Sequence, residues 1–139
     1  EKFMIQLKEK IHKNPHVKVI MTTPNIGFII IRLMLLFGSF NYGKKGILDK
    51  THTRLFTFSS FKNLLQQSGF RLTNVSGIPV PFPLITGNNF FGKSLIKLNN
   101  FLIFISKTIF SYQIYCEIKP QMSVELLLEQ AKFKADNEE

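Results

Sequence analysis

The stretch SSFKNLLQQSGFRLTNVSGIPVPFP, residues 59–83, predicts a helix followed directly by a strand. Apolar residues recur at helical spacing over 59–69, where Ser59 or Thr57 is placed to cap the helix and Gly69 to end it. The strand that follows runs into prolines, which have no N–H to donate to a central ladder. A helix and a strand joined by one glycine indicate an α/β chain.

The neighbouring segments continue this alternation in both directions. Upstream, VKVIMTT (17–23) is short, β-branched and bounded by prolines, so we expect a buried strand, with helices at 2–13 and 26–37 on either side. Downstream, residues 93–109 predict a helix and SYQIYCEIKP (111–120) predicts a strand. Alternating helices and strands imply an α/β sheet covered by helices on both faces.

The ends of these elements set the expected domain boundaries. Asn25 and Gly38 are placed to cap the helix over 26–37. Residues 38–56 form a long loop rich in Gly, Lys, Asn and Thr, and loops of this length in compact domains are often functional. We expect one domain over 1–120, followed at 121–139 by a helical extension that ends in the acidic tail ADNEE.

The charge of the chain favours certain classes of partner. Its net charge is +9, and between residues 10 and 116 the only acid is Asp49. A basic surface raises the expectation of a nucleic acid or an anionic membrane as partner. The single cysteine, Cys116, excludes an internal disulfide and is typical of a reducing, cytoplasmic location. Because the chain begins at Glu1, we expect it to be a piece of a longer protein.

Two apolar runs do not have the length of a transmembrane helix. Arg32 interrupts residues 26–37, and several lysines and asparagines interrupt 93–110, whereas a span needs about 20 apolar residues. Attachment to a membrane surface stays open, because Phe104 projects from the polar face of the second helix. The other interpretations of Phe104 are an isolated exposed side chain without a function, part of a lid, or a dimer contact. That polar face consists of Lys93, Lys97, Asn100 and Lys107.

Three segments together resemble the C-terminal half of class I S-adenosylmethionine-dependent methyltransferases: VIMTTPN (19–25), GILDKTHTRLFTFSSFKNLLQQSGFR (46–71) and SYQIYCEIKP (111–120). Some members of that family carry a loop of the form G-x-L-D-x-T-H-x-R-x-F-T before a helix that ends in Gly-Phe. The resemblance covers about residues 1–120. It implies a partial Rossmann-like methyltransferase sheet with flanking helices, in which the last of three strands is antiparallel and inserts between the other two.

The cofactor signature of the family is missing from this sequence. Members place a Gly-rich turn after the first strand and an acidic residue at the end of the second. No G-x-G occurs anywhere in the chain. The resemblance therefore implies that the first four strands lie outside the chain and that S-adenosylmethionine binds in the intact enzyme, through residues unknown here. The strand over 17–23 would then be an open hydrophobic edge that pairs with the missing N-terminal half or with a second copy.

The loop motif supplies the predicted site residues. His52 is the predicted catalytic residue, because the resemblance puts it near the methyl-transfer site, where an imidazole removes the proton of an attacking hydroxyl. Its alternative role is to fix the loop through hydrogen bonds. Asp49 either orients His52 or forms an ion pair with Arg54, and Arg54 otherwise contacts an anionic acceptor.

Three further residues are expected to bind the acceptor. Tyr42 is placed to line the same mouth, or is simply half-buried. Thr23 and Asn25 follow a strand at the sheet edge where open α/β folds bind ligands, unless Asn25 only caps a helix. No metal site is predicted, because Pro15 interrupts the helix that would align His12 with His16.

These patterns predict the acceptor-side portion of a methyltransferase that is incomplete for catalysis by itself. In the intact enzyme it would direct a methyl group from S-adenosylmethionine to a small molecule, with an oxygen acceptor favoured by His52. Two alternatives stay open. One is a truncated, non-catalytic domain that acts as a protein-interaction module through its open edge. The other is a basic protein that binds a membrane surface or a nucleic acid through the 93–109 helix.

Overall fold

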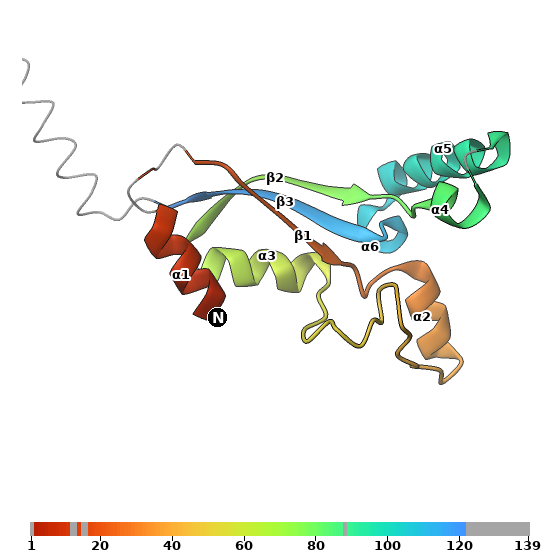
Figure 1. Ribbon diagram of the computed structural model, residues 1–139, viewed down its shortest axis with the longest axis horizontal. Helices are drawn as coiled ribbons and strands as arrows, with labels where there is room; N and C mark the ends of the chain where they lie inside the picture. The colour runs from red at the N-terminus through yellow and green to blue at the C-terminus, as the bar shows by residue number, and fades with distance from the viewer. Residues whose placement is uncertain (1, 12–13, 15–16, 88, 122–139) are drawn as a thin grey trace, which may run out of the picture.

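A three-stranded sheet organises the chain (Figure 1). The computed structural model describes residues 2–11, 14, 17–87 and 89–121. The strands are β1 (Val19–Pro24), β2 (Phe70–Ile78) and β3 (Gln113–Pro120). They lie in the order β1-β3-β2, and β3 is antiparallel to both neighbours. The last described strand therefore lies between the other two, which confirms the expected order, within an α/β fold with flanking helices.

One face of the sheet packs against α1 (Lys2–Ile11) and α3 (Phe58–Gln67). Alternate residues of β3 point into this core, and Ile114, Cys116 and Ile118 are fully buried there. Each of them pairs with a residue of β1 on one side and a residue of β2 on the other. Cys116, for example, lies between Met21 of β1 and Val75 of β2. The helices and β2 supply the other buried side chains: Met4, Phe58, Phe61, Leu65 and Phe70.

The opposite face of the sheet carries exposed and polar side chains instead of an apolar layer. Ile20 is 59% exposed there, and Thr22 and Arg71 are also exposed. Helical cover on both faces, as the sequence led us to expect, is thus wrong for the described part of the chain. Inward and outward residues alternate along β1 and β3, while a bulge interrupts the alternation in β2. The described helices supply apolar partners for the inward set.

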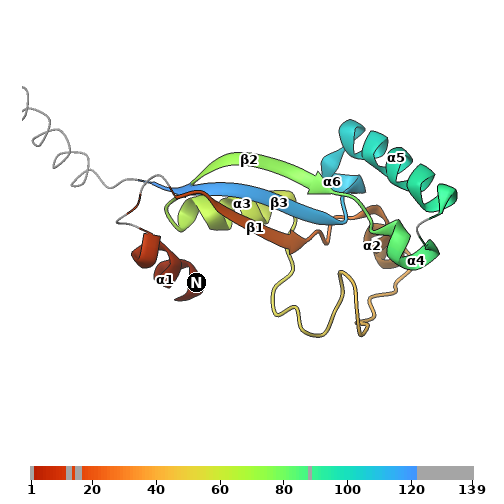
Figure 2. The ribbon, with the colours of Figure 1, turned by 45° about the horizontal axis from the view of Figure 1, so that its top comes forward.

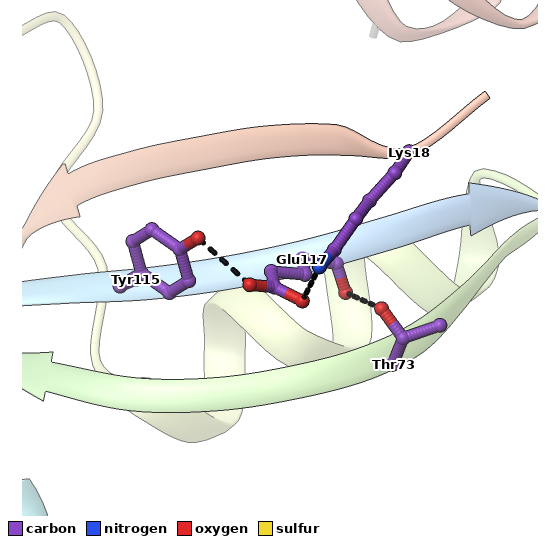
Figure 3. A network of polar contacts seen from close by, with 4 residues as sticks. All are labelled: Lys18, Thr73, Tyr115 and Glu117. Atoms are coloured by element: carbon purple, nitrogen blue, oxygen red, sulfur yellow. Dashed lines mark hydrogen bonds and ion pairs between the residues drawn. The ribbon is translucent and has the colours of Figure 1, made fainter.

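A polar network ties the three strands together on this open face (Figure 3). The ammonium of Lys18 forms an ion pair with Glu117, and the Tyr115 hydroxyl donates to the same carboxylate at 2.8 Å. Thr73, the extra residue of a bulge in β2, donates through its hydroxyl to the backbone oxygen of Glu117 at 3.1 Å. Lys18 first, and Tyr115 second, hold the pKa of Glu117 below its usual value.

The helix caps agree with the sequence at one helix and differ at another. At α3, Thr57 and Ser60 form the capping box, and Gly69 follows the helix with φ +79°. At α2 (Ile29–Leu36), the predicted cap at Asn25 is wrong, because the chain turns first and Phe28 occupies the N-cap. Phe37 is the C-cap of α2, and Gly38 follows it with φ +68°.

Three helices gather at the end of the sheet where β2 stops (Figures 1 and 2). They are α4 (Phe82–Thr86), α5 (Phe90–Ile105) and α6 (Lys107–Phe110). The single helix expected over 93–109 begins earlier and breaks at Ser106, and α4 was not predicted from its proline-rich sequence. The expected extension at 121–139 lies, except for its first residue, outside the described residues. None of the helices in the described part of the chain has the length and apolarity that a bilayer crossing requires.

Candidate functional site

The loop over residues 38–57, here called the site loop, is anchored by a small core of its own. Ile47 and Leu48 are buried against Ile31 of α2. Partly buried apolar side chains surround these three: Ile26, Phe28, Met34, Leu55 and Tyr112. The site loop is therefore packed against α2 and the start of β3, and its polar residues are held in place by buried neighbours.

Two backbone bridges fold the site loop back onto itself and onto the sheet. Gly43 bridges to Asp49, and its N–H donates to the Leu48 oxygen at 2.8 Å. Nearer the sheet, Asn25 bridges to Phe56, and the N–H of Ile26 donates to Phe56 at 2.9 Å. The first bridge brings the segment after Tyr42 beside Asp49. The second brings the segment after Arg54 to the C-terminal end of β1.

Asp49 and His52 belong to one tight turn. The backbone N–H of His52 donates to the backbone oxygen of Asp49 at 3.0 Å, and the carboxylate of Asp49 accepts from the N–H of Thr51 at 2.8 Å. The Thr51 N–H lowers the pKa of Asp49 most, and the nearby His52 lowers it further. Asp49 is thus an ionised carboxylate close to the imidazole at neutral pH, although its link to His52 runs through the backbone.

The imidazole of His52 is half-buried and carries an unsatisfied atom. Its Nδ1 is buried and has no hydrogen-bond partner among the described residues. Buried polar atoms in folded proteins almost always have a partner, and leaving one unpaired costs about 1–3 kcal/mol. The alternative role of His52 was to fix the loop through side-chain hydrogen bonds. Nδ1 makes no such bond within the described residues. Among the buried side-chain polar atoms of the described loop, Nδ1 is thus the one left without a partner, and it is a candidate for a bond to a bound molecule.

Arg54 and Tyr42 lie on the exposed side of the site loop. Arg54 and Asp49, both within the described residues, form no ion pair, so the predicted pairing of the two is wrong. The guanidinium of Arg54 instead lies 6.0 Å from the ring centroid of Phe56, which holds it beside the sheet. Tyr42 is 44% exposed and contacts the ring of Phe40 edge-on. Both side chains are accessible to a ligand.

Thr23 and Asn25 differ in what they offer. Thr23 is half-buried in β1, opposite Ile114. Asn25 is fully buried, and its Nδ2 donates to the backbone oxygens of Thr108 and Ser111 while its Oδ1 accepts from the N–H of Gly27. Its polar atoms are thus used within the fold. We call these three hydrogen bonds the Asn25 clamp. Its mark in the sequence is Gly27, two residues after Asn25, because a Cβ at that position would approach Asn25 Oδ1 to 3.0 Å.

The described residues do not form a site that fits S-adenosylmethionine. Dinucleotide-like sites of open α/β sheets use a Gly-rich turn after one strand and a carboxylate at the end of another. Here β1 ends at the buried Asn25 and β2 ends in prolines. The carboxylate of Glu117 lies within β3 and is bound to Lys18. The described strand ends therefore supply neither the Gly-rich turn nor the strand-end carboxylate of such a cofactor site.

Cavities also lie away from the site loop, and none of them was predicted from the sequence. A cavity of about 640 Å³ separates α1 from the end of α3, and Lys8, Glu9 and Gln66 are among its lining residues. A smaller one, of about 300 Å³, lies between the start of α3 and α6, where Lys62 and Lys107 line it. The Lys107 ammonium is already used there, since it donates to the Val75 oxygen at 3.0 Å.

Comparison with known proteins gives no family assignment: no protein-family model matches the chain, and no curated protein matches its sequence.

Proposed function

We propose that residues 1–120 form the acceptor-side portion of an S-adenosylmethionine-dependent methyltransferase, whose intact form methylates an oxygen of a small molecule. The observation that carries this proposal is His52, half-buried on an anchored loop with Nδ1 unpaired. The β1-β3-β2 order with an antiparallel central strand supports it, since this is the arrangement implied by the resemblance. The proposal assigns the cofactor-binding half to another segment.

The residues of the site loop have distinct roles in this proposal. His52 accepts the proton of the acceptor hydroxyl, which increases the nucleophilicity of that oxygen. Asp49 lies three residues before His52 in the same turn, where its carboxylate accepts from the N–H of Thr51 and its pKa is lowered. Arg54 and Tyr42 are exposed at the mouth and bind the acceptor, with Arg54 suited to an anionic group. Thr23 borders the site at the end of β1. Asn25 positions the site loop through its backbone bridge to Phe56.

Methyl transfer by the intact enzyme tests this assignment. Label from methyl-labelled S-adenosylmethionine is followed into a panel of small hydroxyl compounds. We expect His52→Ala to lower turnover by about 10²–10⁴-fold, the usual contribution of a positioned general base. Thr53→Ala is the matched control, because Thr53 is exposed in the same loop. Wild-type turnover in His52→Ala would leave His52 only a structural role.

The open edge of β1 favours a second candidate function, a module that binds another chain. Among the described residues β1 pairs only with β3, so its outer edge has no strand partner. Unpaired edges of this kind accept a strand from a second polypeptide. We expect the chain alone to self-associate in sedimentation equilibrium and Ile20→Lys to reduce that association, with Phe3→Lys on α1 as the exposed control. A monomer at high concentration argues against this candidate.

A further inference from the structure

Helix α5 carries large apolar side chains, interspersed with polar ones, on the side that faces solvent. On the inner side, Asn99 is buried and joins two segments: its Oδ1 accepts from the Val80 N–H at 2.8 Å, and its Nδ2 donates to the Phe110 oxygen at 3.0 Å. These bonds fix which side of α5 faces outward. The outward side chains are mainly large and apolar: Phe90, Leu98, Phe101, Phe104 and Ile105.

The exposure of these side chains is unusually high. Phe90 and Phe104 are each 89% exposed, and Phe101 is 61% exposed. On a helical wheel Phe90, Phe101 and Phe104 fall on one side, opposite the buried Asn99. A helix with apolar residues all round is normally covered on every side, and contiguous exposed apolar surface marks an interaction site. We call this surface the α5 outer face, formed by the five apolar residues above together with Lys93 and Lys97.

The charge on the α5 outer face has one sign. Lys93 and Lys97 are exposed on it, one turn apart. Residues 79–112, which contain α4, α5 and α6, include no aspartate or glutamate. The α5 outer face therefore combines phenylalanine rings with lysines and has no acidic side chain from its own region to neutralise them.

We propose that the α5 outer face lies on an anionic lipid membrane, with the helix in the plane of the interface. In this orientation the phenylalanine rings enter the boundary between headgroups and acyl chains. The lysines extend their aliphatic stems along the helix and place their ammonium groups at the lipid phosphates. Sixteen residues give a helix about 24 Å long, which provides a continuous line of contact.

Charge and topology favour this occupant over a protein surface. A two-fold contact between two α5 outer faces would bring the lysines of both copies together in an apolar interface without a counter-charge. The cofactor half of the proposed function would extend the sheet at β1, whereas α5 is connected to β2 at the other edge. An anionic bilayer supplies both the negative charge and the apolar layer that the α5 outer face requires.

Vesicle flotation tests the proposal with the full chain. We use vesicles of phosphatidylcholine alone and of an equal mixture of phosphatidylcholine and phosphatidylglycerol, and we expect stronger binding to the mixture. Replacing both lysines (Lys93→Gln with Lys97→Gln) should weaken binding to the anionic vesicles by about fivefold for each lysine and leave binding to neutral vesicles unchanged. The variant Phe101→Ser with Phe104→Ser should lose about tenfold for each ring on both kinds of vesicle.

Matched substitutions elsewhere on the surface act as controls. Lys10→Gln with Lys62→Gln makes the same change of charge at α1 and α3, and Phe3→Ser with Ile5→Ser removes exposed apolar side chains from α1. Both should bind vesicles as the wild type does. The proposal is overturned if the chain does not float with anionic vesicles, or if the control variants lower binding as much as the α5 variants. It is also overturned if the α5 variants only abolish self-association in sedimentation, which would assign the face to a second copy.

Discussion

The amide nitrogen of Asn25 donates a hydrogen bond to the backbone oxygen of Ser111 at 2.9 Å, across 86 residues of sequence. The second hydrogen of the same amide goes to the Thr108 oxygen at 3.0 Å, and its Oδ1 accepts from Gly27 at 2.9 Å. One buried side chain thus joins the end of β1, the end of α6 and the start of β3. The site loop bridges to this same point through Phe56.

We expect Asn25→Ala to lower the free energy of unfolding by about 2–4 kcal/mol. The substitution leaves two backbone oxygens and one N–H without their partner in a fully buried place, and each such group costs about 1–3 kcal/mol before relaxation. Urea denaturation measures the loss. Asn41→Ala, at an exposed asparagine of the site loop, should change stability by less than about 0.5 kcal/mol. Equal losses in the two variants would contradict the clamp.

Gly77 is expected to tolerate no side chain while Ser111 is present. A Cβ at Gly77 would overlap the Oγ of Ser111 and lie 2.7 Å from its Cβ. We predict that Gly77→Ala destabilises the fold by about 3 kcal/mol, since β2 and the start of β3 must separate. Ser111→Gly should recover part of this loss when combined with Gly77→Ala. Thermal unfolding of the two single variants and the double variant measures the coupling, and simple additivity would exclude the contact.

Acid should weaken the polar network of the open sheet face. Because Lys18 and Tyr115 hold the pKa of Glu117 below its ordinary value of 4.5, the folded chain favours the charged carboxylate. The stabilisation is complete above pH 4.5 and is lost as the pH falls through the lower folded pKa. We expect the difference in unfolding free energy between wild type and Glu117→Gln to shrink over that range. Glu9→Gln, on α1, is the control, and a difference that is constant with pH would contradict the network.

Leu48 is predicted to hold the site loop in place. Leu48→Ala removes a buried side chain next to Ile47 and Ile31, which should cost about 2–3 kcal/mol. Amide hydrogen exchange in residues 38–57 should accelerate more than exchange in β3. Lys50→Ala, at an exposed position of the same loop, should leave both rates as in the wild type. Unchanged loop exchange in Leu48→Ala would show that the loop does not depend on this core.

The elements that the sequence predicted well are those fixed by neighbours in the chain. The helix over 59–69 was predicted because Thr57 caps it and Gly69 follows it, and both features lie within a few residues of its ends. The strand over 17–23 was predicted from its β-branched run between prolines. Capping residues, terminal glycines and β-branched runs act through neighbours in the sequence. Their effect therefore does not depend on which distant residues pack against the helix or strand.

One prediction failed because it depended on distant residues, and another failed among neighbours in the site loop. Asn25 resembles a helix cap, but its side chain is taken by Thr108 and Ser111, which are 83 and 86 residues away. The alternative in which Arg54 pairs with Asp49 failed within the site loop, because Arg54 lies over Phe56 while Asp49 turns back to Thr51. The turn that joins His52 to Asp49 is local, so the loop motif grouped these residues in the sequence, but the partners of their side chains were not predictable from it.

Titration calorimetry with S-adenosylmethionine tests the central claim most directly. The ligand is titrated into the 139-residue chain and into a longer polypeptide that joins this chain to the proposed cofactor half. We predict no saturable binding by the chain alone, because its described strand ends do not form the cofactor site, and saturable binding by a longer polypeptide that carries a Gly-rich cofactor half. Saturable binding by the chain alone would contradict the account, as would a longer polypeptide that fails to bind.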